Sequence, residues 1–106
     1  MRERNEFDTL LLKTIDNSLK EVFTENVAST IYAYLKSSYA LDQEQIPEKL
    51  DLFQDGLHNF LSTGAYVVEN VILENLYSDL QIRRQLGNER DFKNSIFQLK
   101  TCLKLR

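Results

Sequence analysis

The sequence is poor in the residues that make tight turns and covalent cross-links. Its 106 residues include three glycines, one proline and one cysteine. So few glycines and prolines leave few positions for hairpin turns, which disfavours an all-β fold and favours long helices. A single cysteine cannot form a disulfide within the chain, so nothing indicates an oxidising compartment, and we expect a cytoplasmic location.

Long apolar runs are also missing. No run approaches the roughly 18 residues that a membrane-spanning helix needs, so no membrane contact is expected. Residues 1–7 are charged and lack the apolar segment of a signal peptide; we expect them to form a frayed terminus or a helical lead-in. With 42% apolar and 27% charged residues, the composition is that of an ordinary globular protein, and the length predicts a single domain over residues 1–106.

The residues that usually assemble an active site are scarce. His58 is the only histidine and Cys102 the only cysteine, and the sequence places them on different helices with no second ligand of the same type for zinc. We expect His58 at the edge of a helix face and Cys102 as an inert, buried thiol. No phosphate-binding loop, dinucleotide fingerprint or nucleophile elbow is present. We therefore predict no enzyme, no catalytic residue and no cofactor.

What the sequence does contain is helical periodicity. Apolar residues recur at three- and four-residue spacing in five segments, which predicts an all-α, single-domain bundle of about five helices. Asp8 is the expected N-cap of the first helix, and Thr24 or Asn26 of the second. Asn88 is the expected cap of the last helix, with the core residues Phe92, Ile96, Leu99 and Leu103 after it. The predicted helices cover residues 8–22, 26–38, 47–63, 65–81 and 89–104.

The third and fourth helices are expected to form the centre of the bundle. Pro47 suits the first turn of the third helix, and Gly64 stands where a left-handed residue would end it. The fourth helix, residues 65–81, is apolar over about half its circumference, so we expect it to be central and to contact several neighbours. The sequence does not determine where this helix ends between Leu80 and Gly87, because no helix breaker comes before the glycine.

One carboxylate falls inside the apolar face of the fourth helix. At about 100° per residue, Glu69 lies between Ala65 and Leu76, which predicts a buried glutamate. A buried carboxylate needs partners, and the expected ones are free N–H groups at a helix start, a tyrosine hydroxyl or an arginine. The alternative is a functional group at the helix junction, acting as a polar switch or a ligand contact.

The net charge of −3 hides an uneven distribution. Residues 1–80 carry 6 Lys/Arg and 14 Asp/Glu, a net charge of −8, whereas residues 81–106 carry 7 and 2, a net charge of +5. A basic tail on an acidic body can bind nucleic acid, an acidic partner or another copy of the same body.

Two charged faces follow from this distribution. The acidic face of the third helix comprises Glu48, Asp51 and Asp55; it lacks the loop ligands and glycine of calcium sites, so we expect a solvated surface and no metal. The basic surface has an aromatic ring at its centre, which favours a protein contact, within a homodimer or with another protein, over nucleic acid. Its members are Arg83, Arg84, Arg90, Lys93, Phe97, Lys100 and Lys104.

The middle of the chain resembles a known family. The segments that carry the likeness are L-K-S-S-Y-A-L, Q-I-P-E-K, F-x-x-x-L and T-G-A-Y-V-V-E-N-V-I-L-E-N-L-Y. They resemble small archaeal helical domains described as output domains of signal-transduction proteins, the Nitrosopumilus output-domain group. The likeness covers roughly residues 12–103. It implies an all-helical module that stands alone or follows a sensor, receiver or DNA-binding domain, and it implies no reaction. Residues 81–87 depart from the short glycine-containing turn of that group.

These observations lead to three hypotheses about function. The first is a non-enzymatic signalling or protein-interaction module that works through its helix surfaces. The second is a small nucleic-acid-associated or transcription-related protein that uses the basic C-terminal helix. The third is an enzyme or small-ligand binder with Glu69 and His58 at a shared pocket.

Overall fold

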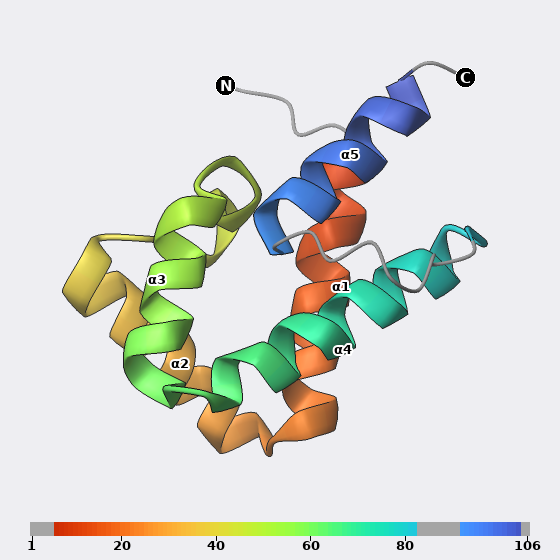
Figure 1. Cartoon of the computed structure of the whole chain (residues 1–106). Helices are drawn as coiled ribbons and strands as arrows, with labels where there is room; N and C mark the ends of the chain where they lie inside the picture. The colour runs from red at the N-terminus through yellow and green to blue at the C-terminus, as the bar shows by residue number, and fades with distance from the viewer. Residues whose placement is uncertain (1–5, 83–91, 105–106) are drawn as a thin grey trace.

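The computed structural model shows an all-α bundle, as predicted (Figure 1). It describes residues 6–82 and 92–104, and the side chains of residues 102–104 are not included in that description. Within these ranges there is no strand. The elements are α1 (Glu6–Val22), α2 (Glu25–Tyr39), the 3₁₀ helix η1 (Gln43–Glu48), α3 (Leu50–Leu61), α4 (Gly64–Asp79) and α5 (Phe92–Lys104).

The first two helices form where their apolar faces and caps predict. α1 buries Leu11, Ile15 and Leu19 on one face, although it begins at Glu6, so Asp8 lies in its first turn and not at the N-cap. The Thr24 side chain caps α2 by accepting a hydrogen bond from the Val27 N–H at 3.3 Å. This cap directly follows the end of α1, which sets α2 at a corner against α1.

The predicted helix over residues 47–63 is wrong at its start. Pro47 lies inside η1, and α3 begins only at Leu50, after a break at Lys49 where φ is −128° and ψ is 54°. The reason is local. The Gln45 side chain accepts a hydrogen bond from the Asp42 N–H at 3.0 Å and so starts a separate helical turn before the proline.

The predicted end of that helix is also corrected. Ser62, with a φ of 54°, takes the positive-φ conformation expected of Gly64, and Gly64 is the first residue of α4. The corner between α3 and α4 is therefore only two residues long. The Ser62 N–H bonds to the His58 carbonyl at 2.9 Å, and the Ser62 carbonyl accepts from the Ala65 N–H at 3.1 Å. The backbone of Ser62 thus makes a hydrogen bond to the end of α3 and another to the start of α4.

The remaining predictions concern the end of α4 and the start of the last helix. α4 ends at Asp79, before the range left open by the sequence, and Gln81 follows with a φ of 57°. The predicted start of the last helix at residue 89 and its cap, Asn88, lie outside the described residues. The α5 core residues Phe92, Ile96 and Leu99 are buried as predicted.

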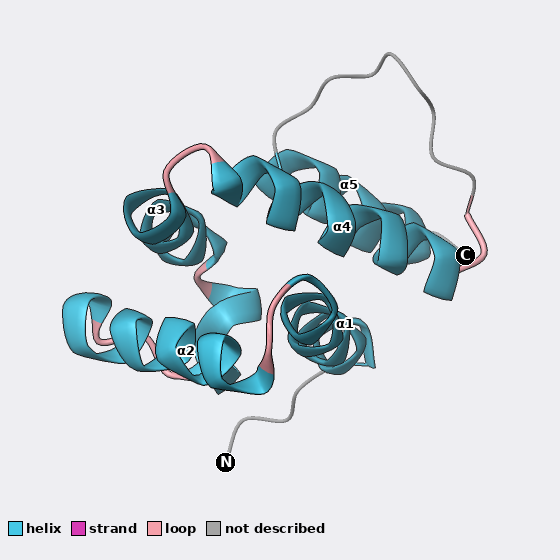
Figure 2. Cartoon of the chain, turned by 90° about the horizontal axis from the view of Figure 1, so that it is seen from below, coloured by secondary structure: helices cyan, strands magenta, loops and turns pink. Residues whose placement is uncertain are grey.

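The helices pack around α1, α3 and α4. Figure 2 looks along α1 and shows α4 and α5 side by side above it, with α2 and α3 to its left. α4 packs against α1, α3 and α5. α1 also packs against α2 and η1, and α3 also packs against α2, α5 and η1, so these three helices share the centre of the bundle. None of the helices within residues 6–82 and 92–104 is long and apolar enough to cross a membrane.

Candidate interaction cleft

A cleft of about 410 Å³ opens where α5 meets the start of α1 and the junction of η1 with α3. Its apolar walls come from three parts of the chain that are distant in sequence, because α1, α3 and α5 converge at this end of the bundle. Charged side chains stand among the apolar ones. The lining residues, taken together, are Phe7, Asp8, Leu11, Pro47, Glu48, Leu50, Asp51, Lys93, Ile96, Phe97, Lys100 and Thr101.

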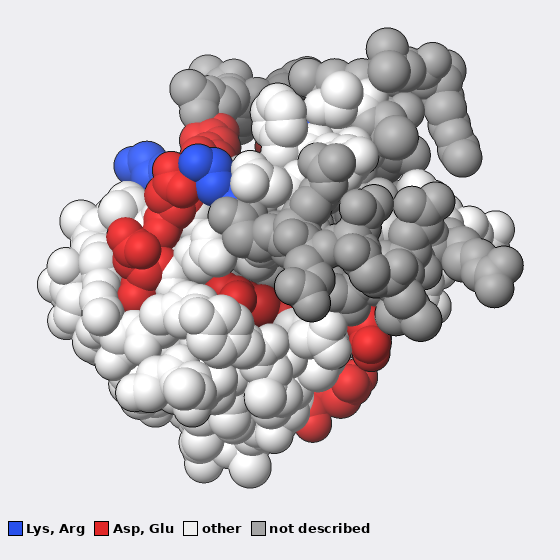
Figure 3. Space-filling model, viewed as in Figure 1, with Lys and Arg blue, Asp and Glu red and all other residues white. Residues whose placement is uncertain are grey.

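Two ion pairs cross the cleft. Lys93 Nζ lies 2.7 Å from Asp51 Oδ1, and Lys100 Nζ lies 3.3 Å from Asp8 Oδ1. The Lys100 pair is the more enclosed, since the Asp8 side chain is only 12% exposed, whereas the Asp51 side chain is 69% exposed. Each pair ties α5 to a different helix. Figure 3 shows acidic and basic side chains next to one another at this end of α3.

These pairs change the interpretation of the two charged faces. The sequence suggested that the basic tail could bind an acidic partner or the acidic body of another copy, but Asp51 and Lys93 already meet within one chain. The described lysines of α5 do not form a uniformly positive surface, because each is neutralised by a carboxylate. A phosphate backbone would have to displace those carboxylates to bind here.

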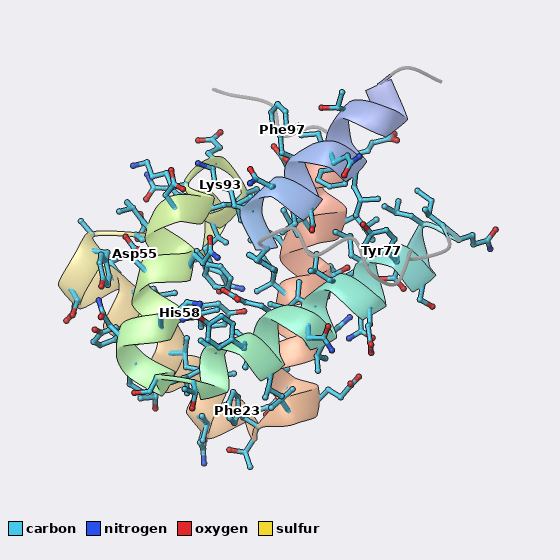
Figure 4. The ribbon with its side chains drawn as sticks, in the orientation of Figure 1. Phe23, Asp55, His58, Tyr77, Lys93 and Phe97 are labelled. Atoms are coloured by element: carbon cyan, nitrogen blue, oxygen red, sulfur yellow. The ribbon has the colours of Figure 1, made fainter. Side chains whose placement is uncertain are left out.

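Phe97 is the least covered large apolar side chain of the described residues. It is 68% exposed, although it lies at the rim of an apolar cleft. Lys93 and Lys100, one helical turn to either side, lie on the same cleft. Figure 4 shows Lys93 near the start of α3 and Phe97 projecting from α5. An exposed aromatic ring flanked by charges is typical of the anchor residues of protein interfaces.

The other members of the predicted surfaces lie elsewhere. Glu48 belongs to η1 and lines the cleft, while Asp55 is on α3, exposed, and does not line it (Figure 4). Lys104 ends α5, but its side chain and those of Cys102 and Leu103 lie outside the description. Arg83, Arg84 and Arg90 also fall outside the described residues.

Glu69 forms a second polar site at the corner between α3 and α4. The residue is 6% exposed, and its Oε2 lies 3.0 Å from His58 Nε2. The Tyr66 ring meets the His58 ring edge-on at a centroid distance of 4.6 Å. The sequence suggested a helix start, a tyrosine hydroxyl or an arginine as the partner of Glu69, but this contact comes from His58, which is half-buried.

The pair joins a side chain of α3 to a side chain of α4. Within the described residues, no three His, Cys, Asp or Glu side chains gather as a metal site would require. The geometry is that of a polar link across the corner.

The sequence did not predict two polar contacts that the structure shows, one at the cleft and one between α1 and α4. It gave Asp8 only a capping role, whereas Asp8 pairs with Lys100 from the opposite end of the chain. It also missed a buried polar link between α1 and α4, in which Asn75 Nδ2 donates to Ser18 Oγ at 2.9 Å and Thr14 Oγ1 donates to Asp79 Oδ2 at 3.1 Å. The available signal was the presence of Thr14 and Ser18 on the apolar face of α1.

Comparisons of the chain with known protein families, curated proteins and solved structures found no match. The resemblance to archaeal output domains therefore stays a prediction.

Proposed function

We propose that this protein is a non-enzymatic interaction module, of the kind used in signalling, and that it binds a protein segment at the cleft between α1, α3 and α5. The observation that carries the proposal is the 68% exposure of Phe97 at the rim of an apolar cleft. Leaving so large an apolar side chain in water forgoes about 2 kcal/mol of burial energy, which a bound partner would recover.

The charges around the cleft support a protein ligand over a nucleic acid. The rim carries carboxylates of α1, η1 and α3 opposite the lysines of α5, so it presents both signs within one surface. A protein helix with apolar residues on one face and mixed charges at its sides complements such a rim. Polyanionic nucleic acid would meet the carboxylates unfavourably.

The proposal is tested by selecting helical peptides from a random displayed library on the full-length protein. We expect amphipathic peptides that bind with a measurable affinity in isothermal titration calorimetry. Phe97→Ala should weaken their binding by at least about tenfold, because truncated aromatic anchors lose most of their interface energy. The matched control is Tyr66→Ala, which removes another exposed ring, 64% exposed, that does not line the cleft.

Peptides that bind Phe97→Ala as well as the unchanged protein would contradict the proposal, and so would a library that yields no binder. The nucleic-acid hypothesis is examined in parallel by fluorescence anisotropy with labelled duplex and single-stranded DNA over a range of salt. Binding that collapses as salt rises, and that Lys93→Glu and Lys100→Glu abolish, would favour that hypothesis instead.

A further inference from the structure

We infer that the partner bound at the cleft is a second copy of this chain. The two copies meet through the same surface, with Phe97 of each copy inserted into the cleft of the other. This inference rests on the proposed function and names the partner. Its basis is that one surface contains both parts of a contact: a projecting aromatic ring, and beside it a cleft whose other lining residues include apolar and charged side chains in equal number.

The ring does not fill its own cavity. Phe97 lines the cleft but remains 68% exposed, so most of its surface points away from Leu11, Leu50 and the other apolar walls. A two-fold dimer uses the same patch on both molecules, so the patch must contain both the projecting side chain and the cleft that receives it. Two clefts placed face to face bury two Phe97 rings and leave no free copy of the patch, so the assembly stops at two chains. A patch with a projecting ring but no cleft would need a different partner.

The charges of the cleft have the arrangement that a two-fold contact requires. All its acidic residues, Asp8, Glu48 and Asp51, lie on the side of α1, η1 and α3, while its lysines, Lys93 and Lys100, lie on α5. A two-fold axis in the plane of the interface, running along the boundary between these halves, sets each acidic half against the basic half of the other copy. A patch of one sign would repel its own copy.

The ion pair between Lys93 and Asp51 within each chain does not block this contact. The Lys93 and Asp51 side chains are 45% and 69% exposed, so both have solvent-facing surface left for a second ion. An exposed pair of this kind contributes little by itself. In the dimer, the same side chains join a four-membered network of alternating sign in a drier environment, where charge interactions are stronger.

The test is sedimentation equilibrium of the full-length protein, with concentrations raised to about 1 mM so that weak association is covered. We expect a monomer–dimer equilibrium that Phe97→Ala weakens by at least about tenfold. Tyr66→Ala should leave it unchanged, and circular dichroism of both variants checks that the helices persist. A wild-type protein that stays monomeric over the whole range overturns the inference, as does a dimer that Phe97→Ala leaves intact.

A second measurement identifies which residues of the two copies are in contact. In a mixed sample of labelled and unlabelled chains, isotope-filtered NMR should show nuclear Overhauser effects between the Phe97 ring and Pro47 or Leu50 of the other copy; a dimer without them overturns the inference. The outcomes separate the two proposals. A monomeric protein whose cleft still binds selected peptides keeps the proposed function and rejects the second copy as the partner.

Discussion

At the scale of single residues, Gly56 allows two helices to pack closely. Gly56 lies in the middle of α3, where a Cβ atom would come within 2.2 Å of Leu35 Cδ2 and 3.2 Å of a Tyr39 ring carbon. Leu35 is 1% exposed and has little room to move. α2 and α3 therefore approach so closely only because this position carries no side chain.

Gly56→Ala should accordingly destabilise the protein. Overpacking against Leu35 outweighs the gain in helix propensity of about 1 kcal/mol, for a net loss of about 1–2 kcal/mol in the free energy of unfolding. The matched control is Gly64→Ala, whose Cβ would be 3.7 Å from Leu61 Cβ. Urea denaturation should show this control unchanged or more stable by up to about 1 kcal/mol. Equal stabilities of the two variants would contradict the packing argument.

A second residue-scale feature is the contact between His58 and Glu69. Because the carboxylate is buried and the 3.0 Å contact crosses the corner between α3 and α4, the two side chains should be energetically coupled. In a double-mutant cycle of His58→Ala and Glu69→Gln, we expect a coupling of about 1–2 kcal/mol, measured by chemical denaturation.

The control cycle pairs His58→Ala with Lys13→Gln. Lys13 is exposed on α1, on a different helix from both His58 and Glu69, so these effects should add within about 0.5 kcal/mol. Additivity in the His58 and Glu69 cycle would show that the contact contributes nothing to the stability of the corner.

At the scale of helices, polar contacts inside the bundle fix how neighbouring helices are paired. Tyr32 of α2 donates a hydrogen bond to Asp16 Oδ1 of α1 at 2.9 Å. Burial raises the pKa of Tyr32 above its ordinary value of 10.0, and the hydrogen bond to Asp16 and the negative charge of that carboxylate raise the pKa further. Asp16 also pairs with Lys20 at 2.9 Å, so three side chains meet between α1 and α2.

The raised pKa has a defined effect on stability. The folded protein keeps the Tyr32 proton at a pH where the unfolded chain releases it, so this group favours unfolding as pH rises above about 10. Tyr32→Phe should lower the free energy of unfolding by about 1 kcal/mol at about pH 8, through loss of the hydrogen bond. The difference from wild type should shrink at about pH 11 in urea denaturation. A difference that is constant with pH would contradict the assignment.

At the scale of the whole molecule, the uneven charge of the sequence becomes a contact between the two ends of the chain. The basic C-terminal helix packs against the acidic body, and Lys100 bonds to Asp8 across 92 residues of sequence. This packing creates the cleft, and it converts the described part of the basic surface into a surface of both signs. This mixture of charges supports our proposal of a protein partner over a nucleic acid.

The sequence by itself determined the helical class, the approximate extents of the helices and the position of Glu69 on an apolar face. These properties follow from local periodicity, because residues three and four apart share a helix face regardless of what packs against it. The same logic places Lys93, Phe97 and Lys100 together on α5.

Only the tertiary structure decided which faces meet. Periodicity carries no information about the partner of a face, so the contacts of Lys93 with Asp51 and of Lys100 with Asp8 were not predictable. The sequence brought His58 and Glu69 together only in its third hypothesis, as groups of a shared pocket, and did not predict the direct contact between them. The positive φ of Ser62 also depends on how the chain must turn to bring α3 between α2 and α4. The cleft exists because these packed helices converge there, which no single segment of the sequence specifies.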